Sequence, residues 1–248
     1  MKLSAFAMIV SMAALWIGST APAWADETDV VKSGSQQPQE VEVVIKMQLK
    51  YLLFLPEGYD KDEKKSWPLI LFLHGAGESG NDLDKVKKHG PPKILQTKTD
   101  FPFIVVSPQS PRFGWNVDAL LGLLDHVEEK YRVDRRRIYL TGLSMGGYGT
   151  WSLAARAPER FAAAVPICGG GSPRDGKKLK DLPLWVFHGA KDKVVPISQS
   201  EKMVEAVKSV DGDVEFTIYP EAGHDSWTKT YDDPKLYEWL LKHKRAKK

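Results

Sequence analysis

The stretch GLSMGGYGT, residues 142–150, carries the clearest structural signal in the chain. An apolar run, Ile138–Leu140, precedes it, and Trp151 and Leu153 follow it, so it is predicted to turn from a strand into a helix. A Gly-x-Ser-x-Gly pattern alone recurs by chance in about one of ten chains of this length. Between a strand and a helix, however, it is typical of a nucleophile elbow, in which the serine hydroxyl stands exposed on a sharp turn.

Two glycines flank the serine of this turn at equal distances. Gly142 and Gly146 stand two residues before and two residues after Ser144. In an elbow the strand and the helix approach so closely that a Cβ at either position would collide. The turn also directs the helix N-terminus at the serine, which favours developing negative charge there. We therefore predict that Ser144 is a nucleophile, provided that other segments supply a base and an acid.

Strand patterns and helix patterns alternate around this turn. Continuous apolar runs are typical of parallel strands covered on both faces, and they occur at residues 68–73, 103–106 and 184–187. Residues 41–55 are predicted to form one or two extended segments, and residues 214–219 a half-exposed strand nearer an edge. The alternation predicts an α/β fold with a mostly parallel sheet and helices on both faces.

Three segments have the spacing of helices with one buried face. They are residues 117–131, residues 203–207 and the segment that follows Asp233-Pro234. An aspartate followed by proline is a good helix start, and Leu236, Leu240 and Leu241 are then expected to face inward. Ligands of such sheets bind beyond the carboxyl ends of the strands, where the motifs below are expected to meet.

The N-terminus has the layout of a secretory signal peptide. A basic start at Lys2 leads into an apolar segment, residues 3–18, and then into the small-x-small pattern Ala23-Trp24-Ala25. An uncleaved membrane anchor is the alternative, although the apolar run is short for a membrane span. We predict cleavage after Ala25, a secreted or periplasmic location, a flexible leader over 26–40 and a single catalytic domain over 41–248.

Charge and cysteine content restrict the partners. The formal net charge of +3 is close to balance and does not favour a nucleic-acid partner, and the basic C-terminal cluster, residues 243–248, is interpreted as a solvated tail. Cys168 is the only cysteine, so an internal disulfide is impossible. No membrane contact is expected after signal cleavage, and the oligomeric state is left open.

A base and an acid follow Ser144 in the chain. His224 lies in a loop after the last predicted strand, and Asp192 lies just past the buried run 184–187. The order Ser144, Asp192, His224 is that of α/β-hydrolases. Asp225 adjoins His224, but neighbouring side chains diverge, and Asp175 is a distant second choice. We predict that His224 is the general base and that Asp192 orients it.

Two other histidines also end apolar runs. His74 and His188 each precede a glycine, and both are interpreted as structural residues that bond loop backbone. An acyl-transfer site also needs N–H donors for the oxyanion. We predict the backbone N–H groups of Met145 and of Ala76, in the glycine-rich loop 74–80, although those glycines could serve the turn alone.

Four motifs together resemble a known family. They are LHGAGE at 73–78, GLSMGG at 142–147, HGAKD at 188–192 and GHDSW at 223–227. They resemble the secreted α/β-hydrolases called phospholipase/carboxylesterase-like or predicted peptidase, which are similar to feruloyl esterases, acetyl-xylan esterases and dienelactone hydrolases. The resemblance spans roughly residues 40 to 245. It implies the same triad and oxyanion donors, and no cofactor.

The resemblance also implies a substrate class. The short link 169–182 leaves no room for the cap that many relatives carry, so an open site for feruloyl, acetyl or other short-chain or aromatic esters, free or attached to polysaccharide, is expected. Trp227 and Trp115 are candidates for the substrate pocket, with core packing an equal interpretation, and no spacing resembles a metal site. The rival functions are a serine peptidase of the prolyl-oligopeptidase type and a non-catalytic binding protein on a hydrolase scaffold.

Overall fold

The computed structural model describes residues 36, 38, 41 and 46–246, and the chain from Lys46 onward forms one compact unit. The predicted signal peptide and most of the predicted leader lie outside the described residues. Seven strands form one sheet, in the order β1-β3-β2-β4-β5-β6-β7. The strands are β1 (Lys50–Phe54), β2 (Trp67–Leu73), β3 (Ile104–Gln109), β4 (Val133–Leu143), β5 (Ala163–Ile167), β6 (Leu184–Gly189) and β7 (Val214–Tyr219).

Only β1 runs antiparallel to its neighbour, β3, and the other neighbouring strands of the described sheet are parallel. The α-helices are α1 (Gly90–Ile94), α2 (Val117–Lys130), α3 (Met145–Arg156), α4 (Ser198–Lys208), α5 (Trp227–Asp232) and α6 (Pro234–Lys242). Short 3-10 helices are η1 (Tyr59–Lys61), η2 (Ala76–Glu78), η3 (Leu83–Lys88), η4 (Pro158–Arg160) and η5 (Pro173–Leu179). The predicted α/β-hydrolase fold is therefore confirmed.

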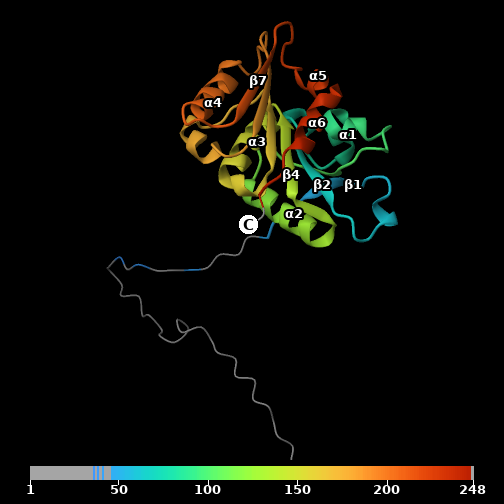
Figure 1. The fold of residues 1–248 in the computed structure, drawn as a ribbon. Helices are drawn as coiled ribbons and strands as arrows, with labels where there is room; N and C mark the ends of the chain where they lie inside the picture. Colours follow the sequence, from blue (N-terminus) through green and yellow to red (C-terminus); the bar gives the residue numbers. More distant parts are fainter. Residues whose placement is uncertain (1–35, 37, 39–40, 42–45, 247–248) are drawn as a thin grey trace, which may run out of the picture. The chain divides into compact units, whose positions relative to one another are not determined.

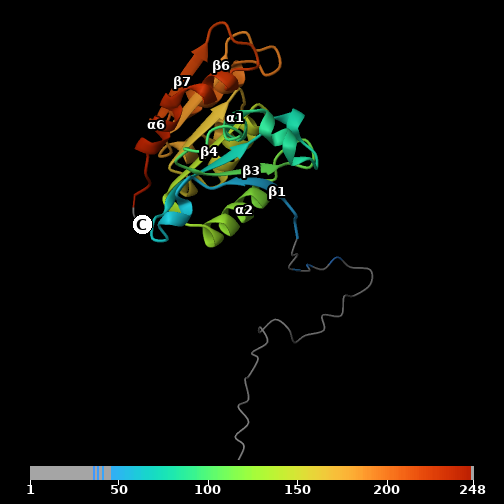
Figure 2. The ribbon, with the colours of Figure 1, turned by 90° about the vertical axis from the view of Figure 1, so that its right-hand side faces the viewer.

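The sheet separates two apolar cores because successive side chains of a strand point to opposite faces. In β2, Leu69, Leu71 and Leu73 belong to the core that α2, α3 and α4 cover. Ile70 and Phe72 belong to the core that α5 and α6 cover. Figures 1 and 2 show the two helical layers on opposite sides of the strands. Burial on both faces explains why the central strands are continuously apolar in sequence.

Most of the predicted elements are present, with two differences. In the predicted extended segment 41–55, residues 42–45 lie outside the described part, and the strand is β1 alone. Leu241 was expected to face inward, but its side chain is 38% exposed, whereas Leu236 and Leu240 are buried. The prediction for Leu241 is wrong because a helix turns by about 100° per residue, so Leu241 lies off the face that Leu236 and Leu240, four residues apart, direct to the core. The half-exposed β7 does lie at the sheet edge, as predicted.

The turn between β4 and α3 has a strained backbone. Ser144 separates the last residue of β4 from the first residue of α3, and its φ of 53° and ψ of −117° lie in a region that L-residues rarely occupy. A Cβ on Gly142 would overlap the carbonyl oxygen of Gly146, and one on Gly146 would overlap that of Leu73. The steric requirement for both glycines is thus confirmed. The glycine at position 146 allows α3 to pack directly against the end of β2.

No helix in the described part of the chain combines the length and the apolar character that a membrane crossing needs.

Replacing Gly146 by alanine should destabilise the fold. The new methyl group would meet backbone atoms of Leu73 and His74, which cannot rotate away, so we expect a loss of about 1–3 kcal/mol or more in the free energy of unfolding. Urea denaturation measures this loss. Gly122→Ala is the matched control, because nothing lies within 4 Å of its added Cβ in α2 and alanine favours helices. Equal stability of the two variants would contradict the prediction.

Candidate active site

Ser144 stands at the end of the central strand β4 with its hydroxyl directed at an imidazole. Its backbone N–H donates to Ile167 O at 3.0 Å, and its carbonyl accepts from Tyr148 N at 3.0 Å, which fixes the turn at both ends. Ser144 Oγ lies 2.9 Å from His224 Nε2. This geometry allows the hydroxyl to donate its proton to the ring nitrogen.

Asp192 lies in the loop after β6, and His224 lies in the loop after β7. His224 Nδ1 lies 2.7 Å from Asp192 Oδ2, so the ring N–H donates to the carboxylate. This bond leaves Nε2 free of hydrogen in the neutral ring, as a base requires. The structure brings together all three residues of the predicted Ser-Asp-His order, and their catalytic roles remain a prediction.

The Asp192 carboxylate is held by several donors. Its Oδ1 accepts the backbone N–H groups of Val194 and Val195 at 2.8 and 2.9 Å. Burial alone would raise the pKa of Asp192, but the hydrogen bonds from His224, Val195 and Val194 outweigh it and lower that pKa. His188 Nε2 lies 3.2 Å from Oδ2 and 2.9 Å from Val195 O, so this buried histidine braces the same loop. The carboxylate is therefore ionised and fixed in place.

Asp225 and Asp175, the two alternatives to Asp192 considered from the sequence, form contacts elsewhere. Asp225 Oδ1 accepts the N–H of Thr228 at 3.0 Å, in the first turn of α5. Asp175 lies 2.8 Å from Lys178 within η5. Neither contact involves His224, in keeping with the choice of Asp192 from the sequence.

The predicted oxyanion donors begin two helical segments. Met145 is the first residue of α3, and Ala76 is the first residue of η2. The first N–H groups of a helix have no acceptor within that helix, so they are available to an external anion. Their assignment stays a prediction.

His74 holds the loop that contains Ala76. Its Nδ1–H donates to Gly75 O at 2.6 Å, and its Nε2 accepts the N–H of Ser110 at 3.0 Å. Burial lowers the pKa of His74 more than the Gly75 bond raises it, so the ring is neutral at pH 7, as this pair of bonds requires. The structural interpretation of His74 agrees with these contacts.

The two candidate tryptophans have different surroundings. The Trp227 ring packs edge-on against His224, with centroids 5.2 Å apart, and against His89, with centroids 5.4 Å apart. Trp115 instead packs on His74, with centroids 4.7 Å apart, and against the core beneath α2 and α3. Trp227 thus borders the candidate triad directly, whereas Trp115 supports the neighbouring loop.

Sequence reasoning missed Tyr148 as a site residue. It lies four positions after Ser144 in α3, and residues at this spacing share one helix face. Its side chain is 37% exposed, and a Cβ on Gly170 would lie 3.1 Å from its ring. Burial and then the nearby charge of Asp192 raise the pKa of Tyr148. The spacing from the serine was the signal that could have found it.

The one group in the described part that could offer three ligand atoms to a metal includes two triad residues. Ligand atoms of Cys168, Asp192 and His224 all lie within 4.8 Å of one another. The Asp192–His224 hydrogen bond would have to break to free these atoms. Their chemistry therefore fits an acid–base pair better than a metal site.

Comparison with known proteins agrees with this geometry. Residues 47–235, which include all three triad candidates, match the dienelactone hydrolase family. "Probable feruloyl esterase C" of Aspergillus terreus is 31% identical over 161 residues, 62% of this chain and 58% of that protein. A bifunctional acetylxylan esterase/xylanase of Neocallimastix patriciarum is 27% identical over 143 residues, 54% of this chain and 20% of that protein.

A solved structure is similar as well. The crystal structure of a thermostable esterase superposes with a TM-score of 0.69 and 34% identity, over 79% of this chain and 60% of that one. The chain thus spans 58% of the Aspergillus protein and less of the Neocallimastix protein. Because the family match extends over most of its length, the chain belongs to the dienelactone hydrolase family of α/β-hydrolases.

Proposed function

We propose that this protein is an exported serine esterase that hydrolyses carboxylic esters through an acyl-enzyme. One observation carries the proposal, namely the continuous hydrogen-bond chain from Ser144 Oγ through the His224 ring to Asp192 Oδ2. The esterases among the relatives support it. Export is inferred from the signal-peptide pattern of residues 1–25 alone.

The proposed reaction has two acyl-transfer steps. His224 Nε2 takes the Ser144 proton as Oγ attacks the ester carbonyl, and the N–H groups of Met145 and Ala76 stabilise the oxyanion. The C–O bond to the alcohol then breaks, and His224 returns the proton to the leaving oxygen. A water molecule, deprotonated by His224, attacks the acyl-enzyme and releases the carboxylic acid and Ser144. Asp192 stabilises the positive charge on the ring in each step.

The proposed substrates are feruloyl, acetyl or similar short-chain or aromatic esters, including those carried on polysaccharide. Relatives named for feruloyl and acetylxylan ester cleavage support this choice. The link between β5 and β6 contains only η5, which leaves the triad without a cap from that link. Trp227 beside His224 offers an aromatic wall to the bound ester.

Cys168 is the nearest alternative nucleophile, and its surroundings disfavour that role. Its side chain is fully buried, and its φ of 39° is rare for a residue other than glycine. Burial raises the pKa of this thiol to about 12, in spite of hydrogen bonds involving Ser144 and Ser226 that lower it. A thiol that stays protonated is a poor nucleophile.

Ser144→Ala should abolish ester hydrolysis while the fold stays intact. Loss of the nucleophile is expected to lower kcat for p-nitrophenyl acetate by about 10³-fold or more. Circular dichroism and the urea midpoint check the fold, and Ser209→Ala, at the end of α4, is the matched control. A fluorophosphonate probe is expected to label the wild type alone. Full activity in Ser144→Ala would exclude the mechanism.

A substrate panel tests the proposed class separately. It compares methyl ferulate, acetylated xylan, short and long p-nitrophenyl esters and a peptide amide. We expect the feruloyl or acetyl esters to give the highest kcat/KM. A peptide amide cleaved as fast as the esters would favour a peptidase instead.

Asp192→Asn should lower stability more at pH 7 than at pH 3. Because the pKa of Asp192 is lowered in the native state from its ordinary value of 3.8, the ionised carboxylate contributes its full stabilisation at pH values above 3.8. This stabilisation is lost as the pH falls through the native-state pKa. Urea denaturation of the wild type and of Asp192→Asn should show a difference in the free energy of unfolding that becomes smaller as the pH falls. A difference that does not change with pH would contradict the lowered pKa of Asp192.

Cys168 should be unreactive in the native protein. With a native pKa near 12 against an ordinary 9.0, about a thousandfold fewer thiolates exist at pH 8, and the sulfur is also buried. Ellman's reagent should therefore titrate no thiol in buffer and one thiol per chain in guanidinium chloride. Rapid native labelling that inactivates the enzyme would show that the thiol is accessible.

A further inference from the structure

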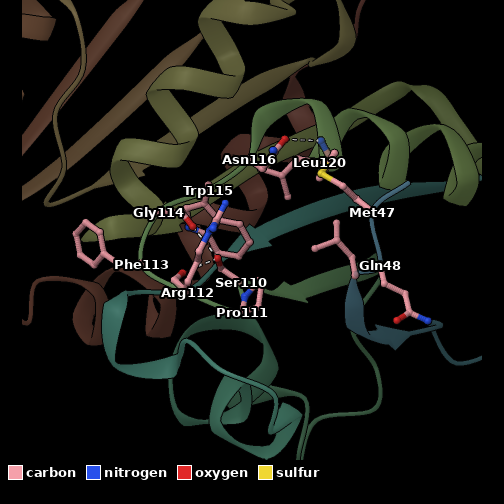
Figure 3. Close-up of a pocket in the computed structure, with 12 residues that line it drawn as sticks. Met47, Gln48, Ser110, Pro111, Arg112, Phe113, Gly114, Trp115, Asn116 and Leu120 are labelled. Carbon is pink, nitrogen blue, oxygen red and sulfur yellow. Dashed lines mark hydrogen bonds between the residues drawn. The ribbon is translucent and has the colours of Figure 1, made fainter. Parts of the chain in front are cut away.

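A hollow borders the loop between β3 and α2, residues 110–116. Its volume is about 620 Å³, and it opens between the chain that leads into β1, the β3–α2 loop and the first turns of α2 (Figure 3). None of the residues that line it is acidic, and one, Arg112, is a permanent cation. The lining residues used below are Gln48, Arg112, Phe113, Trp115 and Asn116.

The loop that forms this hollow is held by its own hydrogen bonds. The Ser110 hydroxyl lies 2.7 Å from Arg112 O and 2.6 Å from Gly114 O, and shares its proton between them. Gly114 has a φ of 97°, which glycine adopts without strain. Asn116 Oδ1 accepts the N–H of Ala119 at 2.9 Å and so begins α2. The loop that carries the side chains of the hollow is therefore fixed by its own hydrogen bonds.

The side chains combine the groups that recognise a sugar bearing a carboxylate. Phe113 is 81% exposed, and an aromatic ring of this kind stacks on the apolar C–H face of a pyranose. No salt bridge engages Arg112 in the described part of the chain, which leaves its guanidinium available for bidentate contact with a carboxylate. Figure 3 labels Arg112 and Trp115 among the residues that line the hollow.

Further hydrogen-bonding groups line the same hollow. The amides of Gln48 and Asn116 can meet sugar hydroxyls, since the Asn116 cap uses only its oxygen. A neutral apolar ligand would leave these donors and the arginine without partners.

The same loop also touches the candidate active site. Gly114 N–H donates to Met145 Sδ at 3.0 Å, and Met145 directly follows Ser144. Ser110 N–H donates to His74 Nε2, and the Trp115 ring packs on His74. The hollow is therefore separated from the oxyanion loop and from the elbow by one layer of side chains.

We propose that this hollow is an accessory subsite for an acidic sugar residue of the glycan whose ester is cleaved at Ser144. The proposal rests on the proposed esterase function and names the alcohol part of its substrate. Binding at the second site would hold the polymer near Ser144 and raise its effective concentration there. Small esters, which cannot span both sites, would gain nothing.

Binding without hydrolysis tests the subsite directly. The probe is xylotriose carrying one 4-O-methylglucuronate, the neutral match is xylotetraose, and calorimetry or tryptophan fluorescence gives Kd for the full chain. We expect saturable binding of the acidic probe, at least about tenfold tighter than the neutral one, with the same Kd in Ser144→Ala. Arg112→Gln should remove this preference, whereas Arg135→Gln, an exposed arginine at the start of β4, should keep it.

The outcomes separate the two proposals. If the acidic probe binds no tighter than xylotetraose, or Arg112→Gln keeps the preference, the subsite is overturned whatever Ser144 does. If the probe binds as expected but Ser144→Ala hydrolyses esters normally, the esterase mechanism fails and the glycan site stands.

A kinetic ratio tests the link between the two sites. The quantity is kcat/KM for acetylated glucuronoxylan divided by kcat/KM for p-nitrophenyl acetate, measured on the same preparation. Phe113→Ala and Arg112→Gln should each lower this ratio several-fold through KM for the polymer. An unchanged ratio in both variants would overturn the proposal that one chain occupies both sites.

Discussion

The approach of α3 to the end of β2 leaves no room for a side chain at Gly146, and the candidate site depends on this approach. Gly146 has no side chain, so its Cα lies against the carbonyl of Leu73. This approach sets the N-terminus of α3 beside the loop that begins at His74. The two predicted oxyanion donors belong to these two segments. The strain at Ser144 is tolerated because β4, α3 and β5 fix the chain on both sides of it.

The parallel sheet brings the remaining groups to the same edge. Asp192 and His224 follow β6 and β7, and they lie far from Ser144 in sequence but within hydrogen-bond distance in space. Neighbouring residues hold both Asp192 and His224 in place. Val194 and Val195 hold Asp192, and Trp227 packs on His224. Such support is what fixed catalytic geometry needs.

The sequence predicted those parts of the structure that depend on local chemistry. The apolar runs predicted β2, β3 and β6 because strands buried on both faces need apolar residues at every position. Gly142 and Gly146 predicted the elbow, because only glycine avoids the overlap there. The order of Ser144, Asp192 and His224 selected the residues that the fold brings together.

The features that the sequence did not predict depend on distant contacts. Leu241 directly follows the buried Leu240, but packing selects the face of α6 that carries Leu236 and Leu240, and Leu241 lies off that face. The closeness of Cys168 to Asp192 and His224 depends on how β5 and β6 pair, which no local pattern encodes. The same is true of the hollow beside Trp115, whose walls come from separate segments.

The short connection between β5 and β6 has a chemical consequence of its own. It carries only η5 and closes nothing over Ser144 from that side. Enzymes that exclude water protect a reactive intermediate from hydrolysis. In the proposed mechanism, an acyl group on Ser144 has no cover from this link against bulk water, whose concentration is far above that of any competing alcohol. The intermediate would then partition to the free acid, and the enzyme would be a poor catalyst of transesterification.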